Sequence, residues 1–321
     1  MKQAINDKLG LFTNNASVIR KDFVWLNVMA KRLVALICTL ENKPIDCIAI
    51  KENLNLIKNN TGLFSMFRGN MSLCIAAMLS LNTDRDKVFA NTISVYDQLN
   101  LAKFGASDYL AVAAYLIACN TEPYNYQHAV RRTRAFYEGM KKHRWFHTGQ
   151  DDYIFTSMLG LSDVGIEEGL VRINLLYEQL KPEFRLAGGG GVQMLAQMLA
   201  ICGKCNDSLE HLFHLRHAFR QRNVRLDKAY TLPALGALSL LDISSDILVN
   251  DMLDAQRYLR AQKGFSSFSI TTQELLLYTS AIISSVYAVE MKSNIVASLT
   301  TSITSIIIAQ QIAIVIAAST T

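Results

Sequence analysis

The chain has 321 residues, half of them hydrophobic, so it can bury a large core in one domain or two. Its 32 basic and 27 acidic residues are well mixed and leave a net charge of only +5, which argues against a nucleic-acid platform. The first residues lack the apolar core of a secretory signal, so we expect a cytoplasmic protein whose six cysteines are reduced thiols.

Residues 1–66 are predicted to form an N-terminal capping hairpin. The run 21–40 reads as a helix that changes from amphipathic to buried, and a second helix follows from Pro44. Proline is favoured in the first turn of a helix. Terminal repeats of a stacked array are commonly atypical, so a looser pattern here is expected of a cap.

A repeat of about forty residues covers 67–290. Pairs of small or polar residues recur in the middle of apolar runs: Ala76-Ala77, Ala113-Ala114, Thr156-Ser157, Ala196-Gln197, Gly236-Ala237 and Thr279-Ser280. A second column has the same period: Tyr96, Tyr137, Tyr177, His217 and Tyr258. Two columns at one spacing indicate repeated structural units.

Each unit reads as two helices, an apolar first helix and an amphipathic second helix. We therefore predict an all-α fold of about seven helical hairpins in a single domain over 1–321, either an open α-solenoid or a closed α/α toroid. Residues 291–321 are predicted to be a C-terminal capping helix. Residues 294–321 are uncharged and long enough to cross a bilayer, so a membrane anchor is the alternative.

The glycine run at 188–190 occupies the link between one hairpin and the next. A phosphate-binding loop would follow a strand and end in Gly-Lys-Ser/Thr, whereas Val192 and Gln193 follow this run. We expect these glycines to serve a turn or a helix end. Basic segments at 131–145 and 216–225 are typical of solvated helix faces, with a nucleic-acid surface as the alternative.

No metal or cofactor is expected. Cys202 and Cys205 form one CxxC pair without the second pair of a zinc ribbon, so free thiols are preferred over a metal or redox site. His211, His214 and His217 would span too wide an arc of one helix to ligate a single ion unaided, so we interpret them as structural.

The best catalytic candidates are His147, Asp151 and Asp152, which cluster at one link. A histidine beside two carboxylates can transfer protons if the link faces a cavity, and capping of the next helix is the alternative for the aspartates. Arg68 lies among aromatic residues and could pair with Asp108 or Asp151, or instead stack and cap. Arg68, Asp108 and Tyr230 are candidates for ligand binding.

Two classes of function are compatible with this pattern. The preferred one is a non-catalytic repeat protein that binds a peptide or protein partner, because stacked hairpins offer long binding surfaces. The alternative is an α/α toroid enzyme, a hydrolase or lyase, with a cavity at the inter-hairpin loops. Its candidate residues would be Arg68, Asp108, His147, Asp151, Asp152 and Tyr230.

The sequence also resembles a family of bacterial proteins of similar length that is known only as a domain of unknown function. The resemblance lies in "NNTGLFSMFRG" (59–69), in "LYEQLK" (176–181) and in the final helix with Gln310 and Gln311. It covers nearly the whole chain. It implies an intracellular bacterial protein and transfers no activity and no catalytic residue.

Overall fold

The computed structural model describes all residues except 25, 145–147, 202–204, 229–230 and 292–321. Within the described residues the fold is helical and has no strand, which confirms the all-α prediction. The α-helices are α1 (Gln3–Asp22), α2 (Val28–Leu40), α3 (Cys47–Asn60), α4 (Ser72–Ser80), α5 (Arg85–Leu101), α6 (Asp108–Asn120), α7 (Tyr126–Arg144), α8 (Tyr153–Leu161), α9 (Ile166–Leu180), α10 (Gly188–Ile201), α11 (Cys205–Gln221), α12 (Leu232–Ser239), α13 (Ser245–Arg260) and α14 (Thr272–Met291). Short 3₁₀ helices are η1 (Met66–Arg68), η2 (Pro123–Asn125), η3 (Gln150–Asp152) and η4 (Arg185–Ala187).

The chain divides into two compact units. Unit 1 comprises Met1–Ser17 and Arg172–Gln311, and unit 2 comprises Val18–Val171 and Ile312–Thr321; residues 292–321 lie outside the described part. The single domain over 1–321 and the choice between solenoid and toroid stay predictions. None of the helices described is long and apolar enough to cross a membrane, and the candidate anchor 294–321 falls outside them.

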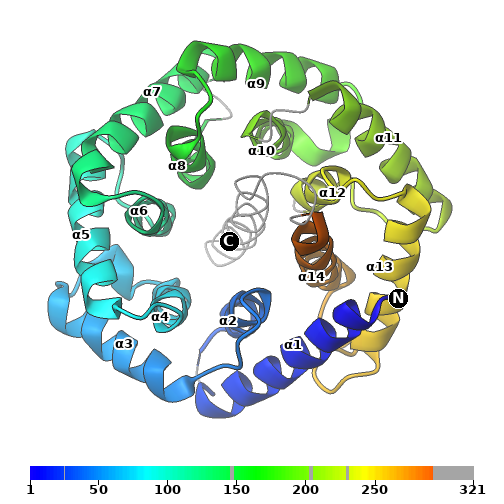
Figure 1. Cartoon of the computed structure of the whole chain (residues 1–321), viewed down its shortest axis with the longest axis horizontal. Coiled ribbons are helices and arrows are strands. Elements are labelled where there is room, and N and C mark those ends of the chain that lie inside the picture. Colours follow the sequence, from blue (N-terminus) through cyan, green and yellow to red (C-terminus); the bar gives the residue numbers. More distant parts are fainter. Residues whose placement is uncertain (25, 145–147, 202–204, 229–230, 292–321) are drawn as a thin grey trace. The chain divides into compact units, whose positions relative to one another are not determined.

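Unit 2 consists of hairpins with a buried first helix and a more exposed second helix. The first helices α2, α4, α6 and α8 form one layer and α3, α5 and α7 form the other (Figure 1). Residues 110–118 of α6 are all buried, as expected of a helix covered on most sides. Ser107 begins α6 by accepting a 3.2 Å hydrogen bond from the Leu110 amide.

The small residues predicted at the centre of each first helix are buried in both units. In α8 the Thr156 hydroxyl donates to the Asp152 carbonyl at 2.8 Å and the Ser157 hydroxyl to the Ile154 carbonyl at 2.7 Å, so their polar atoms are satisfied. In α12 a Cβ atom on Gly236 would lie only 2.2 Å from Met198 Cε of α10. The small residues therefore allow close approach of neighbouring helices.

Unit 1 contains the first helices α10, α12 and α14 and the second helices α11 and α13 (Figure 1). The N-terminal part of α1 packs against α14 in the same unit, although the two are far apart in sequence. Lys8 Nζ donates a 3.0 Å hydrogen bond to Ser285 Oγ, and the Phe12 ring lies 5.3 Å from that of Tyr278. Within residues 1–66, α2 and α3 form the hairpin and α1 precedes it.

One polar contact recurs from repeat to repeat. A side chain of the second helix binds a carbonyl near the end of the next first helix: Arg132 to Gly160 at 2.9 Å, Arg172 to Ala200 at 3.1 Å and His211 to Ser239 at 2.9 Å. The last carbonyls of a helix have no partner within it, so these side chains satisfy groups that would otherwise be left without a bond. They also tie consecutive hairpins together.

The glycine run 188–190 is the start of α10, so the prediction that it lies in the link between two hairpins is wrong. Gly188 has φ +73°, the left-handed conformation expected for it, and ends η4. Gly189, Gly190 and Gly191 then form the first turn of α10. The segment between α9 and α10 is therefore residues 181–187, which includes η4.

Candidate functional site

Four of the predicted site residues, Arg68, Asp108, Asp151 and Asp152, can be placed in the structure. All four belong to unit 2 and lie on links that lead into first helices or at the start of such a helix. His147 and Tyr230 lie outside the described residues.

Arg68 binds the end of α3. Its Nε atom donates to Thr61 Oγ1 at 3.1 Å, and Nη2 donates to the main-chain oxygens of Lys58 and Thr61. Arginine is suited to this position because its planar guanidinium group presents several donors at once. No ion pair joins Arg68 to Asp108 or Asp151 among the residues described.

Asp108 lies in the first turn of α6 and faces the segment between α3 and α4. A Cβ atom on Gly69 would be only 2.8 Å from Asp108 Oδ1, so the small residue makes room for the carboxylate. Burial raises the pKa of Asp108, and a hydrogen bond from the Met71 amide partly opposes this. Within the described structure, its buried Oδ1 atom has no hydrogen-bond partner.

Asp151 and Asp152 have different environments. Asp152 is buried and accepts a 2.9 Å hydrogen bond from the Gly149 amide, so it caps η3. Burial raises the pKa of Asp151, with an opposing hydrogen bond from its own amide. Among the described carboxyl groups at these links, Asp108 and Asp151 are the two whose pKa is raised.

A second kind of feature is an exposed aromatic side chain on a rigid link. Between α3 and α4, Phe67 is buried against Phe89 and Tyr96, with ring centroids 5.6 and 5.1 Å apart. Phe64, three residues earlier, is 94% exposed and follows the exposed Leu63. The link is held by the Arg68 hydrogen bonds described above, so the exposed ring projects from a fixed backbone.

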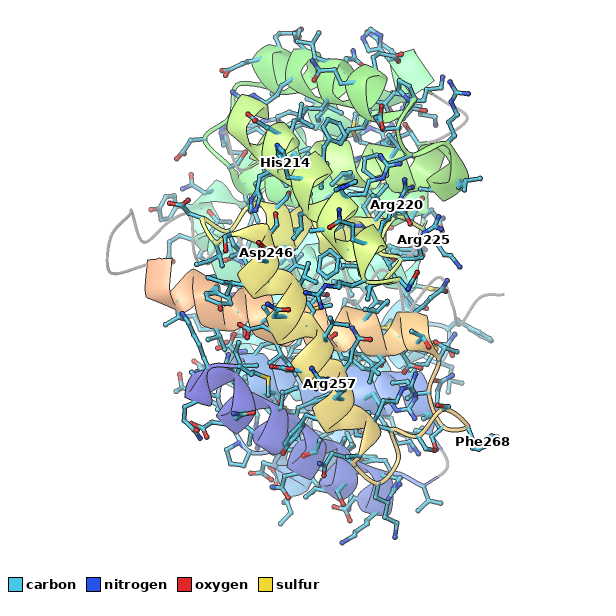
Figure 2. All side chains as sticks on the ribbon, turned by 90° about the vertical axis from the view of Figure 1, so that its right-hand side faces the viewer. His214, Arg220, Arg225, Asp246, Arg257 and Phe268 are labelled. Atoms are coloured by element: carbon cyan, nitrogen blue, oxygen red, sulfur yellow. The ribbon has the colours of Figure 1, made fainter. Side chains whose placement is uncertain are left out.

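The link between α13 and α14 in unit 1 repeats this arrangement. Phe265 is buried 5.4 Å from the Phe12 ring, whereas Phe268 is fully exposed and projects away from the helices (Figure 2). Arg260 Nη1 donates to the main-chain oxygens of Phe265 and Ile270, both at 3.1 Å. An arginine thus fixes each of the two links that display a phenylalanine.

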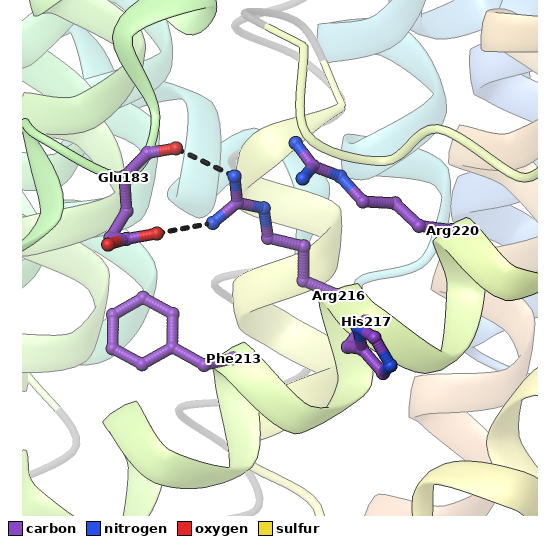
Figure 3. Close-up of a pocket in the computed structure, with 5 residues that line it drawn as sticks. All are labelled: Glu183, Phe213, Arg216, His217 and Arg220. Atoms are coloured by element: carbon purple, nitrogen blue, oxygen red, sulfur yellow. Dashed lines mark hydrogen bonds and ion pairs between the residues drawn. The ribbon is translucent and has the colours of Figure 1, made fainter.

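A pocket of about 340 Å³ lies on α11 in unit 1 (Figure 3). It is lined by Glu183, Phe213, Arg216, His217 and Arg220. Arg216 donates from Nη1 to Glu183 Oε2 at 2.9 Å and from Nη2 to the Glu183 main-chain oxygen at 2.8 Å. This arginine therefore connects the link 181–187 to α11.

Arg220, which also lines the pocket, is hydrogen-bonded to Asp227. Arg220 Nε donates to Asp227 Oδ2 at 2.8 Å, and Arg225 Nε donates to Oδ1 at 3.0 Å. Burial alone would raise the pKa of Asp227, but hydrogen bonds from both arginines, and their charges, lower it below the usual value. Asp227 is therefore a buried carboxylate that positions two guanidinium groups.

The histidines of α11 have separate partners. His211 Nδ1 lies 2.9 Å from the Ser239 main-chain oxygen, His214 lies 3.6 Å from Glu210, and His217 lies 2.9 Å from Gln221. In the described part of the chain, no group of three or more His, Cys, Asp or Glu residues could hold a metal ion. The CxxC pair involves Cys202, which lies outside that part.

Sequence reasoning did not identify the exposed phenylalanines or the Asp227 arginine cluster. From the sequence, the segment 216–225 is interpreted as a solvated helix face, with a nucleic-acid surface as the alternative, because a sequence does not show that a downstream aspartate folds back onto it. The motif Phe-Ser-x-Phe occurs in both links, at 64–67 and 265–268, and its repetition was the available signal. Which phenylalanine of each motif is exposed could not be read from it.

The chain belongs to the family described as "Protein of unknown function (DUF4003)", whose family model matches residues 15–317. This match confirms the resemblance to a domain of unknown function. No curated protein and no solved structure matches the chain.

Proposed function

We propose that this member of the DUF4003 family binds a polypeptide partner through its inter-hairpin links, without catalysing a reaction on it. The observation that carries the proposal is the fully exposed Phe268 on a link fixed by Arg260. Phe64 on the Arg68-fixed link of unit 2 supports it independently. Each unit thus offers its own aromatic contact.

Both the exposed ring and the backbone that carries it contribute to the free energy of binding. Covering a phenylalanine side chain stabilises a complex by about 1.5–3 kcal/mol. Ordering a mobile loop on binding would cost part of that gain, whereas a link that is already fixed avoids the cost. Exposed aromatic residues on a rigid backbone are typical of side chains that dominate protein interfaces.

Photocrosslinking in the host tests the proposal. A photoreactive phenylalanine analogue is placed at Phe64 or Phe268, and in separate chains at Tyr124, an exposed aromatic residue in the turn between α6 and α7. We expect one discrete polypeptide adduct from the two link positions and none from Tyr124.

The same adduct should be lost by competition with unlabelled wild-type chain but retained in the presence of excess Phe64→Ser, Phe268→Ser double variant. Adducts of equal yield from Tyr124, or competition by both chains alike, would show that the links have no special role.

We also propose a cytoplasmic, bacterial setting. The support is the resemblance set out above and the four described cysteines Cys38, Cys47, Cys74 and Cys119, which are all free thiols. Fractionation of host cells into cytosolic, membrane and exported protein tests this. Recovery in the exported fraction would contradict it.

A second candidate is hydrolase or lyase chemistry at the links of unit 2. The observation in its favour is that burial raises the pKa of both Asp108 and Asp151, which suits acid–base roles. A panel of nitrophenyl glycosides and esters tests it, with Asp108→Asn and Asp151→Asn as variants. Turnover that both variants abolish would favour this candidate over partner binding.

A further inference from the structure

The buried carboxylate of Asp227 organises two arginines in unit 1. The Asp227 side chain is 4% exposed, whereas those of Arg220 and Arg225 are 42% and 49% exposed. Each guanidinium group turns its Nε edge toward the carboxylate. Figure 2 shows the two arginines close to each other.

The outward atoms of both arginines remain available. Among the described residues, no hydrogen bond is made by Nη1 of Arg220 or by Nη1 and Nη2 of Arg225. A guanidinium group is a rigid planar donor, so fixing its Nε edge also fixes the direction of its other N–H groups. The pair is therefore oriented before any ligand arrives.

The pocket beside Arg220 can hold the uncharged part of a ligand whose anionic group binds the arginines. One wall is Phe213, stacked 6.2 Å from Phe184, and Arg216 lies over the Phe184 ring at 4.6 Å. Figure 3 shows the Arg220 side chain beside the pair formed by Arg216 and Glu183, and the bonds drawn there join Arg216 to Glu183 alone. Arg216 is paired with Glu183. Of the two arginines that line the pocket, Arg220 is therefore the one with a free guanidinium edge for an anion.

The charges leave a positive excess. Three guanidinium groups, from Arg216, Arg220 and Arg225, are balanced by two carboxylates, Glu183 and Asp227. The excess lies on the two exposed arginines because Arg216 is only 13% exposed and paired. An anion at this place would complete the neutralisation.

We propose that Arg220 and Arg225 bind the phosphate group of a phosphate ester whose organic part enters the pocket beside Phe213. The outward edges present three amino groups, which match the three free oxygens of a phosphate ester better than the two oxygens of a carboxylate. The ester is either a small molecule or a phosphorylated side chain of a polypeptide. This inference does not depend on the proposed partner binding through Phe64 and Phe268.

Calorimetric titration of the full chain with phenyl phosphate tests the inference. We expect wild-type protein to bind, and Arg220→Gln and Arg225→Gln each to weaken binding about tenfold, because each removes a charged donor. The matched control is Arg257→Gln, since Arg257 is an exposed arginine of the same unit whose one ion-pair partner among the described residues is nearby Asp254. The control should bind like wild type.

Two further titrations separate the sources of the ligand. A phosphotyrosine heptapeptide that binds more than tenfold tighter than phenyl phosphate would indicate a polypeptide source, and equal affinity would indicate a small ester. In both cases the unphosphorylated peptide should not bind. Phe268→Ser should leave binding of phenyl phosphate unchanged, which separates this site from the proposed partner surface.

Several results would overturn the inference. It fails if neither phosphate probe binds, if binding survives in both arginine variants, or if benzoate binds as tightly as phenyl phosphate. Circular dichroism of each variant shows whether it folds. Arg225→Gln keeps the contacts of Arg220 with Asp227, so it serves as the test if Arg220→Gln does not fold.

Discussion

Arg260 donates a 3.1 Å hydrogen bond from Nη1 to the main-chain oxygen of Ile270, across the link that displays Phe268. The same atom binds the Phe265 oxygen, and Nη2 binds Thr272 Oγ1 at 3.2 Å. One side chain at the end of α13 thus holds both sides of the link. The backbone around Phe268 is fixed, and the ring is left in solvent.

Replacing Arg260 with lysine should release this link. Lysine keeps the charge but cannot bond to two carbonyls and a hydroxyl with one planar group. We expect a loss of roughly 1 kcal/mol in unfolding free energy and faster amide exchange confined to residues 262–271. Hydrogen–deuterium exchange checks this, and unchanged exchange in that segment would contradict a bracing role for Arg260.

Close packing of α12 on α10 predicts different effects on stability for two glycine substitutions in unit 1. Gly236→Ala would place a methyl group 2.2 Å from Met198 Cε and 2.4 Å from Leu195 Cδ1, so we expect destabilisation of about 1–3 kcal/mol. Gly190→Ala meets no atom within 4 Å in the first turn of α10 and should be neutral or stabilising. Urea unfolding of both variants measures the difference, and equal midpoints would refute the close-packing explanation.

Replacing Arg132 should lower the stability of the protein more than replacing its exposed neighbour Arg131. Its guanidinium group donates to the main-chain oxygens of Gly160, Ser162 and Val164 at 2.9, 2.8 and 2.6 Å. Arg132→Ala leaves these carbonyls without that donor and should cost about 2 kcal/mol. Arg131→Ala, on the exposed face of α7, should change stability by less than about 0.5 kcal/mol. Thermal unfolding of the two variants side by side provides the comparison.

The pKa of Asp108 predicts a dependence on pH. Because its folded pKa is raised above the unfolded value, the folded state holds the proton more tightly, and stability falls as pH rises from about 4 through the folded pKa. Asp108→Asn removes this titration while its oxygen can still accept from the Met71 amide. The variant should gain stability relative to wild type between about pH 4 and pH 7, measured by urea unfolding. If the unfolding free energies of wild type and Asp108→Asn change in parallel with pH, ionisation of Asp108 does not destabilise the folded state.

The hairpins could be predicted from the sequence because their signals are local and repeated. The small pairs such as Ala113-Ala114 are buried at the centres of first helices, where their size and period placed them. The apolar run to Leu40 likewise marked the end of α2, whereas α3 begins at Cys47, capped by Asp46, and not at Pro44. Each of these signals depends on neighbours within one repeat.

Contacts between distant segments could not be predicted in this way. Packing of Phe12 on Tyr278 joins segments more than 260 residues apart, and no local pattern specifies it. Arg132 looked like part of a solvated basic face, although its carbonyl contacts recur at Arg172. A count of charges along a helix does not reveal which charges satisfy main-chain oxygens of another helix.

Partner binding through the links is tested most directly by native mass spectrometry of tagged chains purified gently from the host. Wild type and the Tyr124→Ser control should each carry the same additional polypeptide mass. The Phe64→Ser, Phe268→Ser double variant should carry less than about one-tenth as much of that polypeptide, because two rings that the partner would bury are removed. An equal amount of that polypeptide on all three chains, or a bare wild-type chain, would contradict the account.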